Sequence, residues 1–135
     1  MSFSNTAETA VLEQVFKGTA LPWNANTNLW IALHTADPGE AGTATTSETS
    51  YGSYARVALD RSTGITVSGA VVSNAALAQF PQCSSGTATI THASIVTTAS
   101  GAGTIVARAA LNTSIPVSTG IQPQFAANAL SFTLD

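Results

Sequence analysis

The sequence predicts an all-β protein, an antiparallel β-sandwich of the jelly-roll type that carries one N-terminal α-helix. Three observations support this fold class. A capped amphipathic segment occurs only near the N-terminus, short runs of alternating apolar and polar residues follow it, and turn-forming Asp-Pro-Gly and Ser-Gly sequences separate those runs. Because the later runs have no helical pattern between them, they indicate an antiparallel sandwich or barrel, and a set of about eight strands suits the jelly-roll type of sandwich.

The helix is expected over residues 6–17. Asn5 stands at the N-cap position and Glu8 follows three residues later, which is the pattern of a capping box. Lys17 falls in the last turn, where a cation complements the helix dipole. Gly18 can then adopt the left-handed conformation that ends many helices.

The helix carries an apolar stripe. Val11 and Val15, and likewise Leu12 and Phe16, are four residues apart and share one face. Phe3 precedes the helix and is expected to pack against its first turn. The stripe must be covered, either by the sheet of its own chain or by a neighbouring protein, and the sequence leaves both alternatives open.

The remainder of the chain is predicted to form strands. Residues 28–35 alternate Leu29, Ile31 and Leu33 on one face with Trp30, Ala32 and His34 on the other. Further strands are expected over residues 54–60, 64–67, 70–73, 75–80, 88–98, 104–112, 121–125 and 129–134. Together they predict a single domain over residues 1–135, with an arm and helix at 1–18 and the sandwich at 19–135.

A long polar loop is expected over residues 40–53, because this segment has almost no core-forming side chain. Long loops in compact domains are often functional. Asp37, Glu40 and Glu48 lie in or beside it. Calcium binding there is conceivable, but the spacing of an EF-hand loop is absent, so a solvated loop is the preferred interpretation.

The surface is predicted to be almost neutral. Only 8% of the 135 residues are charged, four basic and seven acidic, so Thr, Ser, Ala, Gly and Asn must form the exterior. Either partners cover that surface or neutral hydroxyl and amide groups hydrate it, and we prefer the first explanation. The four cations are scattered and cannot follow a phosphate backbone, so no nucleic-acid partner is expected. They are Lys17, Arg56, Arg61 and Arg108.

No catalytic motif is found. His34 and His92 match no metal-binding spacing and are expected to be hydrogen-bonded strand histidines. Cys83 is the single cysteine, so no internal disulfide and no cysteine-based metal site is possible. Asp60 is the one acid inside a predicted strand, so the pair of facing carboxylates that a glycosidase needs is absent. Residues 112–114 have the sequence of an N-glycosylation sequon, but because the chain shows no secretion signal we interpret the match as chance. Neither a nucleophile elbow nor a phosphate-binding glycine loop occurs, so no catalytic, metal or cofactor residue is predicted. A small hydrolase would need one of the two histidines joined to an acid and a serine.

The N-terminal residues lack the basic and apolar regions of a secretory signal. No apolar run approaches the roughly 20 residues that span a bilayer. The chain is therefore expected to be made in a cytoplasm and to have no membrane partner. A particle could still carry it outside the cell.

Aromatic side chains are the candidate contact residues. Four of them flank or belong to the strand–loop–strand region, where exposed rings would anchor a protein or sugar partner. For Trp30 and Tyr54, packing in the core or on the second face of the sheet explains the positions equally well. With the two phenylalanines of the arm and helix, the predicted interface set is Phe3, Phe16, Trp23, Trp30, Tyr51 and Tyr54.

Residues 6–60 resemble a known family. The helix ends Val-Phe-Lys-Gly-Thr-Ala at 15–20, the sequence Leu-Trp-Ile-Ala-Leu-His-Thr-Ala-Asp-Pro-Gly-Glu-Ala-Gly follows at 29–42, and Tyr-Gly-Ser-Tyr-Ala-Arg-Val occupies 51–57. This pattern is similar to small virion proteins of tailed bacteriophages that are described as tail-fibre or decoration (cement) proteins. The later part of the chain shares only Ala-Gln-Phe-Pro at 78–81 and the C-terminal Leu-Ser-Phe-Thr-Leu-Asp.

The resemblance implies a non-enzymatic virion structural protein and brings no catalytic or cofactor residue with it. We expect a capsid cement protein that binds the major capsid protein and copies of itself, as a dimer or trimer, on the capsid surface rather than the tail. The chain has no repeat or coiled coil from which a fibre shaft is built. The alternative is a tail-fibre or adhesin module that binds the host surface.

Overall fold

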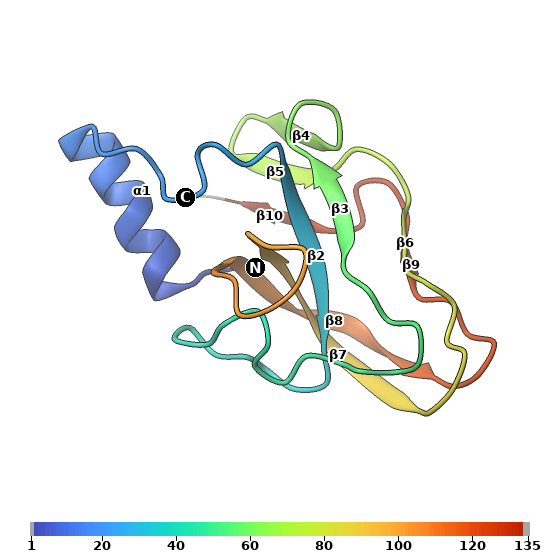
Figure 1. The fold of residues 1–135 in the computed structure, drawn as a ribbon. Coiled ribbons are helices and arrows are strands. Elements are labelled where there is room, and N and C mark those ends of the chain that lie inside the picture. Colours follow the sequence, from blue (N-terminus) through green and yellow to red (C-terminus); the bar gives the residue numbers. More distant parts are fainter. Residues whose placement is uncertain (1, 134–135) are drawn as a thin grey trace.

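The computed structural model describes residues 2–133, which form one helix and antiparallel strands (Figure 1). The helix α1 spans Asn5–Lys17. The strands are β1 Ser2–Phe3, β2 Asn28–His34, β3 Val57–Asp60, β4 Ile65–Ser68, β5 Val71–Asn74, β6 Ala78–Gln79, β7 Ala88–Val96, β8 Ile105–Val117, β9 Gln124–Phe125 and β10 Ser131–Thr133. Every strand except β1 was predicted, and residue 134 of the last predicted strand lies outside the described residues.

The strands form three antiparallel sheets. The largest has the order β1-β8-β7-β2-β3, a second has the order β10-β5-β4, and β6 pairs with β9. The all-β class is therefore confirmed. The jelly-roll arrangement is not, because the strands divide into sheets of five, three and two members rather than two sheets of similar size.

Ser4 begins the helix, so the prediction of Asn5 as the N-cap is wrong. The Ser4 hydroxyl accepts a hydrogen bond from the Ala7 N–H at 3.2 Å and donates one to the Ile105 carbonyl of β8. Glu8 then lies one position too late to complete a capping box. This buried serine both caps α1 and fastens it to the large sheet.

The C-terminal end of α1 follows the prediction. Gly18 adopts a left-handed conformation with φ of 68°, and its N–H donates to the Glu13 carbonyl. The Lys17 ammonium lies 3.1 Å from the Glu13 carboxylate on the exposed side of the last turn. Phe3, expected against the first turn, lies in β1 with its ring edge-on to Phe132 at 5.6 Å.

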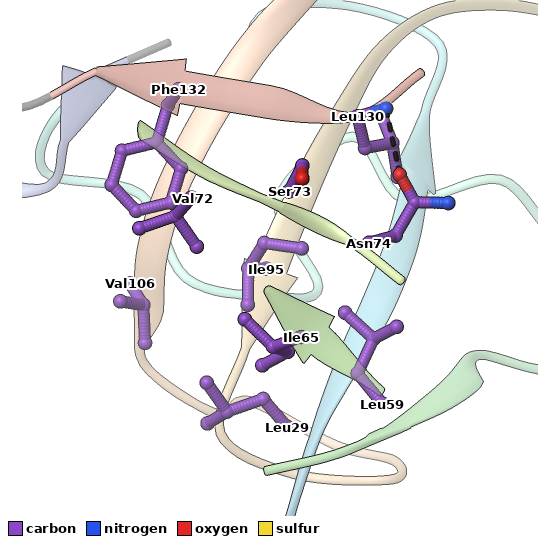
Figure 2. A pocket seen from close by; sticks show the side chains of 10 residues that line it. All are labelled: Leu29, Leu59, Ile65, Val72, Ser73, Asn74, Ile95, Val106, Leu130 and Phe132. Carbon is purple, nitrogen blue, oxygen red and sulfur yellow. Dashed lines mark hydrogen bonds between the residues drawn. The ribbon is translucent and has the colours of Figure 1, made fainter. Parts of the chain in front are cut away.

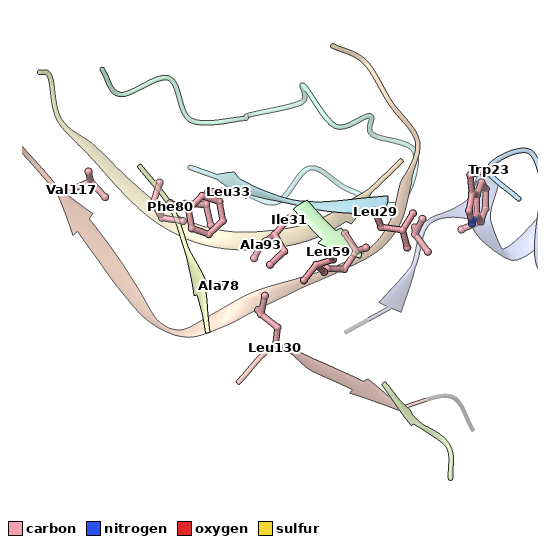
Figure 3. Close-up of a cluster of buried hydrophobic side chains, with 14 of the residues drawn as sticks. Trp23, Leu29, Ile31, Leu33, Leu59, Ala78, Phe80, Ala93, Val117 and Leu130 are labelled. Carbon is pink, nitrogen blue, oxygen red and sulfur yellow. The ribbon is translucent and has the colours of Figure 1, made fainter. Parts of the chain in front are cut away.

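The main core is formed by apolar side chains of α1 and the sheets, and β2 runs through its centre. The Leu29, Ile31 and Leu33 side chains are buried in it, as the alternation predicts (Figure 3). Trp23, which precedes β2, lies at one end of the same cluster.

The second face of β2 is also covered. Ala32 belongs to a smaller buried cluster to which residue Ala44 of the 40–53 loop contributes, and Trp30 packs against it. Thr49 of the same loop is buried too. The expectation of a solvated loop is therefore wrong for these residues, because the segment packs against the sheet.

A cavity of about 80 Å³ lies between the five-stranded and three-stranded sheets (Figure 2). Its wall is apolar except at β5, where the Asn74 side-chain oxygen accepts a hydrogen bond from the Leu130 N–H at 3.0 Å. The lining residues are Leu29, Leu59, Ile65, Val72, Ser73, Asn74, Ile95, Val106, Leu130 and Phe132.

Candidate functional site: the outer face of the helix

The outer face of α1 is apolar and exposed. Leu12, Val15 and Phe16 retain 57%, 66% and 80% of their accessible surface. They share one side of the helix because they lie at i, i+3 and i+4. The sequence left open whether the chain's own sheet or a neighbour covers this stripe, and the sheet does not cover these three side chains.

Small residues explain why the helix turns this face outward. Ala7 and Ala10, three residues apart, are the buried residues of α1, and the helix packs through them against β8 and β1. An alanine methyl group allows close approach of the two backbones, which a leucine or phenylalanine would prevent. The larger side chains are therefore left on the solvent side. Figure 1 shows α1 at one side of the molecule.

The return segment after α1 holds the helix in place from its other end. The Gln14 side-chain oxygen accepts a hydrogen bond from the Leu21 N–H at 3.2 Å. Trp23 follows and is 6% exposed. The Arg61 guanidinium donates to three carbonyls of this turn, including that of Trp23 at 3.1 Å. Both ends of α1 are thus fixed to the body, and the exposed face has a defined position.

Glu8 supplies a negative charge at the N-terminal end of the same face. It lies four residues before Leu12 and seven before Val15, and it is exposed. A carboxylate in the first turn interacts favourably with the helix dipole. Since no ion pair of the described residues includes Glu8, its charge is available to a partner.

The six predicted interface residues do not form one surface cluster. Phe16 alone is exposed, Trp23 and Tyr51 are buried, and the other three are half-buried: Phe3, Trp30 and Tyr54. Their use as contacts to a partner stays a prediction.

The two tyrosines of the predicted set do meet each other. The Tyr51 and Tyr54 rings meet edge-on at 5.4 Å, and Tyr54 stacks on Phe80 at 6.4 Å. The Tyr51 hydroxyl donates to the Pro81 carbonyl at 2.9 Å, and burial raises the pKa of Tyr51 to about 12. Tyr51 is therefore an uncharged core residue at neutral pH.

Arginines neutralise the acids of the loop region. The Arg108 guanidinium lies 2.7 Å from the Asp37 carboxylate and 3.7 Å from that of Glu40, while Glu48 pairs with Arg56. The hydrogen bond that the Gly39 N–H donates to the Asp37 carboxylate, together with the nearby Arg108 charge, lowers the pKa of Asp37. Within residues 2–133 no three His, Cys, Asp or Glu side chains gather in a way that would hold a metal ion. Asp37 and Glu40 therefore tie the start of the loop to Arg108 of β8, while Glu48 is held by Arg56, which precedes β3.

The two histidines are direct cross-strand neighbours. His34 of β2 pairs with His92 of β7. The His34 ring nitrogens lie 2.8 Å from the Thr46 carbonyl oxygen and 2.7 Å from the Ser94 hydroxyl. Burial lowers the pKa of His34, so the ring is neutral at pH 7. Both ring nitrogens are engaged, and His34 joins the loop to the sheet.

Comparison with protein families gives the class of protein: the chain belongs to a family of bacteriophage virion fibre proteins. Residues 2–133 match the family model described as Podophage GP4 fiber I protein gp80. No curated protein matches the chain. The resemblance to phage virion proteins is confirmed. The family description names a fibre protein, which favours the tail-fibre alternative and gives no support to the cement interpretation.

The described part of the chain contains no helix that is long and apolar enough to cross a membrane.

Proposed function

We propose that this chain is a tail-fibre protein that attaches to another virion protein through the outer face of α1. The observation that carries the proposal is the exposure of Leu12, Val15 and Phe16 on one face of a helix whose ends are both fixed. Contiguous exposed apolar side chains with a polar surround are typical of interaction sites. Membership of a fibre family supports a place on the tail.

The partner surface is best described as an apolar groove. Three side chains provide much less than the roughly 800 Å² per partner that a stable pairing of two such faces would bury. A helix that lies in a groove is contacted on several sides and reaches useful affinity from a few anchors spaced at i, i+3 and i+4. Phe16, the most exposed of the three, would be the main anchor.

The charge on this face favours a different protein over a second copy. Two copies of α1 packed face to face in parallel would bring their Glu8 carboxylates together. In the antiparallel arrangement each carboxylate would approach the negative end of the partner helix dipole, where the Lys17 ammonium is already paired with Glu13. A groove with a lysine or arginine at the end that receives Glu8 has no such penalty. Self-association and binding to the major capsid protein, both predicted above, are outcomes of the test.

Attachment through α1 would leave the β-sheets without contact to the attachment partner. The pair β6 and β9 lies at the side of the molecule remote from α1 (Figure 1), so that end of the β structure would point away from the particle. This orientation agrees with a fibre component that meets its surroundings through its β structure.

The test is incorporation into virions. Val15→Ser should lower the copy number on purified particles at least tenfold, while Val67→Ser should leave it unchanged. Val67 is the matched control because it is a 69% exposed valine on β4, outside the proposed face. Both variants should fold normally, since neither side chain is buried, and thermal unfolding of the purified proteins checks this.

Immunogold labelling should place the protein on the tail, and attachment should survive moderate salt because the contact is mainly apolar. Normal incorporation of Val15→Ser would overturn the proposed attachment face. Labelling on the head would overturn the tail location and restore the cement interpretation. Concentration-dependent dimers abolished by Phe16→Ser would place a second copy on the face instead.

A further inference from the structure

Strand β8 has a large bulge at its middle. Ile90 pairs with Ile115 and His92 with Ala110, so one residue of β7 lies opposite four residues of β8, 111–114. These four include the formal sequon noted above. Bulges redirect side chains and are frequent beside functional sites. On its other side β8 is paired by β1 only at Ala107 and Arg108, and no other described strand continues that pairing.

A groove of about 490 Å³ opens beside the bulge. Residues of β8, of β9, of the segment before β10 and of the first position of β10 line it, together with Ala93 of β7. Among residues 2–133, no charged side chain lines it. The lining residues are Ala93, Ala109, Ala110, Leu111, Asn112, Thr113, Ile115, Gln124, Phe125, Ala129, Leu130 and Ser131.

We propose that this groove binds a neutral glycan, an inference that rests on the proposed function in so far as a fibre would present the groove outside the particle. A sugar ring has an apolar face of C–H groups and an edge of hydroxyl groups. The half-buried ring of Phe125 and the side chain of Leu111 suit the apolar C–H face. The amide of Asn112 and the hydroxyl of Thr113 can both donate and accept hydrogen bonds, so they suit the hydroxyl edge.

The polar and aromatic groups of the groove are partly preorganised. The Phe125 ring is held edge-on against the buried Phe80 ring at 6.1 Å and an interplanar angle of 80°. The Gln124 side-chain oxygen accepts from the Gln79 side-chain nitrogen at 3.2 Å, which fixes the amide and leaves its own NH₂ group as a donor. Groups that are already held in place lose less conformational entropy on binding a ligand.

Other ligand classes fit the groove less well. A peptide that added a strand would need a regular edge of backbone N–H and C=O groups, and the bulge at residues 111–114 interrupts it. An anionic or cationic ligand would meet no opposite charge among the described residues that line the groove. The nearest cation along β8, Arg108, already pairs with Asp37 at 2.7 Å. The lining combines apolar side chains with two amides and two hydroxyls, and this uncharged set of groups suits an uncharged polyol.

The test is a glycan array that carries neutral and acidic oligosaccharides, probed with the purified full-length chain. The expected result is binding to a subset of the neutral glycans and to none of the acidic ones. Asn112→Ala should weaken that binding about tenfold by removing one hydrogen-bonding group. Asn24→Ala is the matched control, because Asn24 is an exposed asparagine in a turn outside the groove.

A second variant tests the aromatic contact. Phe125→Leu keeps an apolar side chain against Phe80 but removes the ring, so it should weaken glycan binding while thermal unfolding shows a folded protein. Preference for acidic glycans, no binding to any neutral glycan, or binding undiminished in both variants would each overturn the proposal.

The outcomes separate this proposal from the proposed attachment. Asn112→Ala should be incorporated into virions normally, whereas Val15→Ser should fail to be incorporated yet bind glycans as purified protein. Loss of both properties in either variant would contradict the assignment of two separate surfaces.

Discussion

Arg56 and Glu48 form a two-pronged ion pair, with Nε 2.7 Å from Oε1 and Nη2 2.8 Å from Oε2. The two side chains are only 2% and 14% exposed. Nη1 and Nη2 of the same guanidinium donate to the carbonyls of Thr98 and Gly101 at 2.9 and 2.8 Å. The Tyr54 hydroxyl donates to Glu48 at 2.9 Å. One arginine therefore joins the 40–53 loop to the turn between β7 and β8.

Removal of this arginine should destabilise the fold strongly. Arg56→Met leaves the Glu48 carboxylate buried without its partner, and breaking such a pair costs about 3–5 kcal/mol. Urea unfolding of the purified protein measures this loss. Lys17→Met is the control, because the Lys17–Glu13 pair is exposed and should contribute less than about 1 kcal/mol. Similar losses in the two variants would contradict a structural role for the Arg56–Glu48 pair.

Acidification should destabilise the protein through His34. In the unfolded chain this imidazole takes up a proton near its ordinary pKa of 6.5, whereas burial keeps its pKa lower in the folded state. Arg56 and His92 act in the same direction, and the Thr46 carbonyl and Glu48 oppose it. Below pH 6.5 the unfolded state therefore binds more protons, and the free energy of unfolding falls until the folded pKa is reached.

Calorimetry between about pH 8 and pH 5 should record a falling Tm for the natural chain. His34→Gln should lower the Tm at pH 8 and flatten its dependence on pH over this interval. An unchanged pH dependence in that variant would show that another group is responsible.

The cap at Ser4 should contribute more than an ordinary helix cap. Ser4→Ala removes the acceptor for the Ala7 N–H and leaves the Ile105 carbonyl without its hydroxyl donor. The combined loss should be about 2 kcal/mol in urea unfolding. Asn5→Ala, at the exposed position next to it, should cost less than about 0.5 kcal/mol. The reverse ranking would restore Asn5 as the capping residue.

Filling the cavity between the two sheets should stabilise the fold. Val72 of β5 lines it, and Val72→Ile adds one methylene toward a space of about 80 Å³. Cavity-filling substitutions commonly add about 0.5–2 kcal/mol. Val67→Ile is the control and should have no measurable effect, because Val67 of the neighbouring strand β4 is 69% exposed and does not line the cavity. A lower Tm for Val72→Ile alone would mean that the cavity wall cannot accommodate the extra group.

Strong apolar alternation made most strands predictable. Leu29, Ile31 and Leu33 repeat at every second position, and this pattern indicates a strand and the face of it that enters the main core. Strand β1 was missed because two residues cannot display a period. The packing of the loop was missed because Ala44 and Thr49 carry no marked hydrophobic signal, although both are buried. Their burial depends on the shape of the sheet beneath them.

The candidate sites were less predictable for a related reason. The stripe of Leu12, Val15 and Phe16 was recognised, but periodicity does not tell which side of a helix its own sheet will contact. The alanines at 7 and 10 decided this by their small size. The groove beside β8 was not foreseen, because a bulge and two segments distant in sequence create it. The sequence anticipated only that such a groove would be uncharged, because few residues of the chain are charged.

All four cations of the chain are held by carboxylates or carbonyls of its own fold: Lys17, Arg56, Arg61 and Arg108. A surface of this kind exerts little long-range attraction on a partner, so encounter should proceed at the unsteered rate of about 10⁵–10⁶ M⁻¹s⁻¹. The attachment proposed above would then owe its tightness to slow dissociation. Such kinetics would suit a component that is added once while a particle is built and stays in place on dilution.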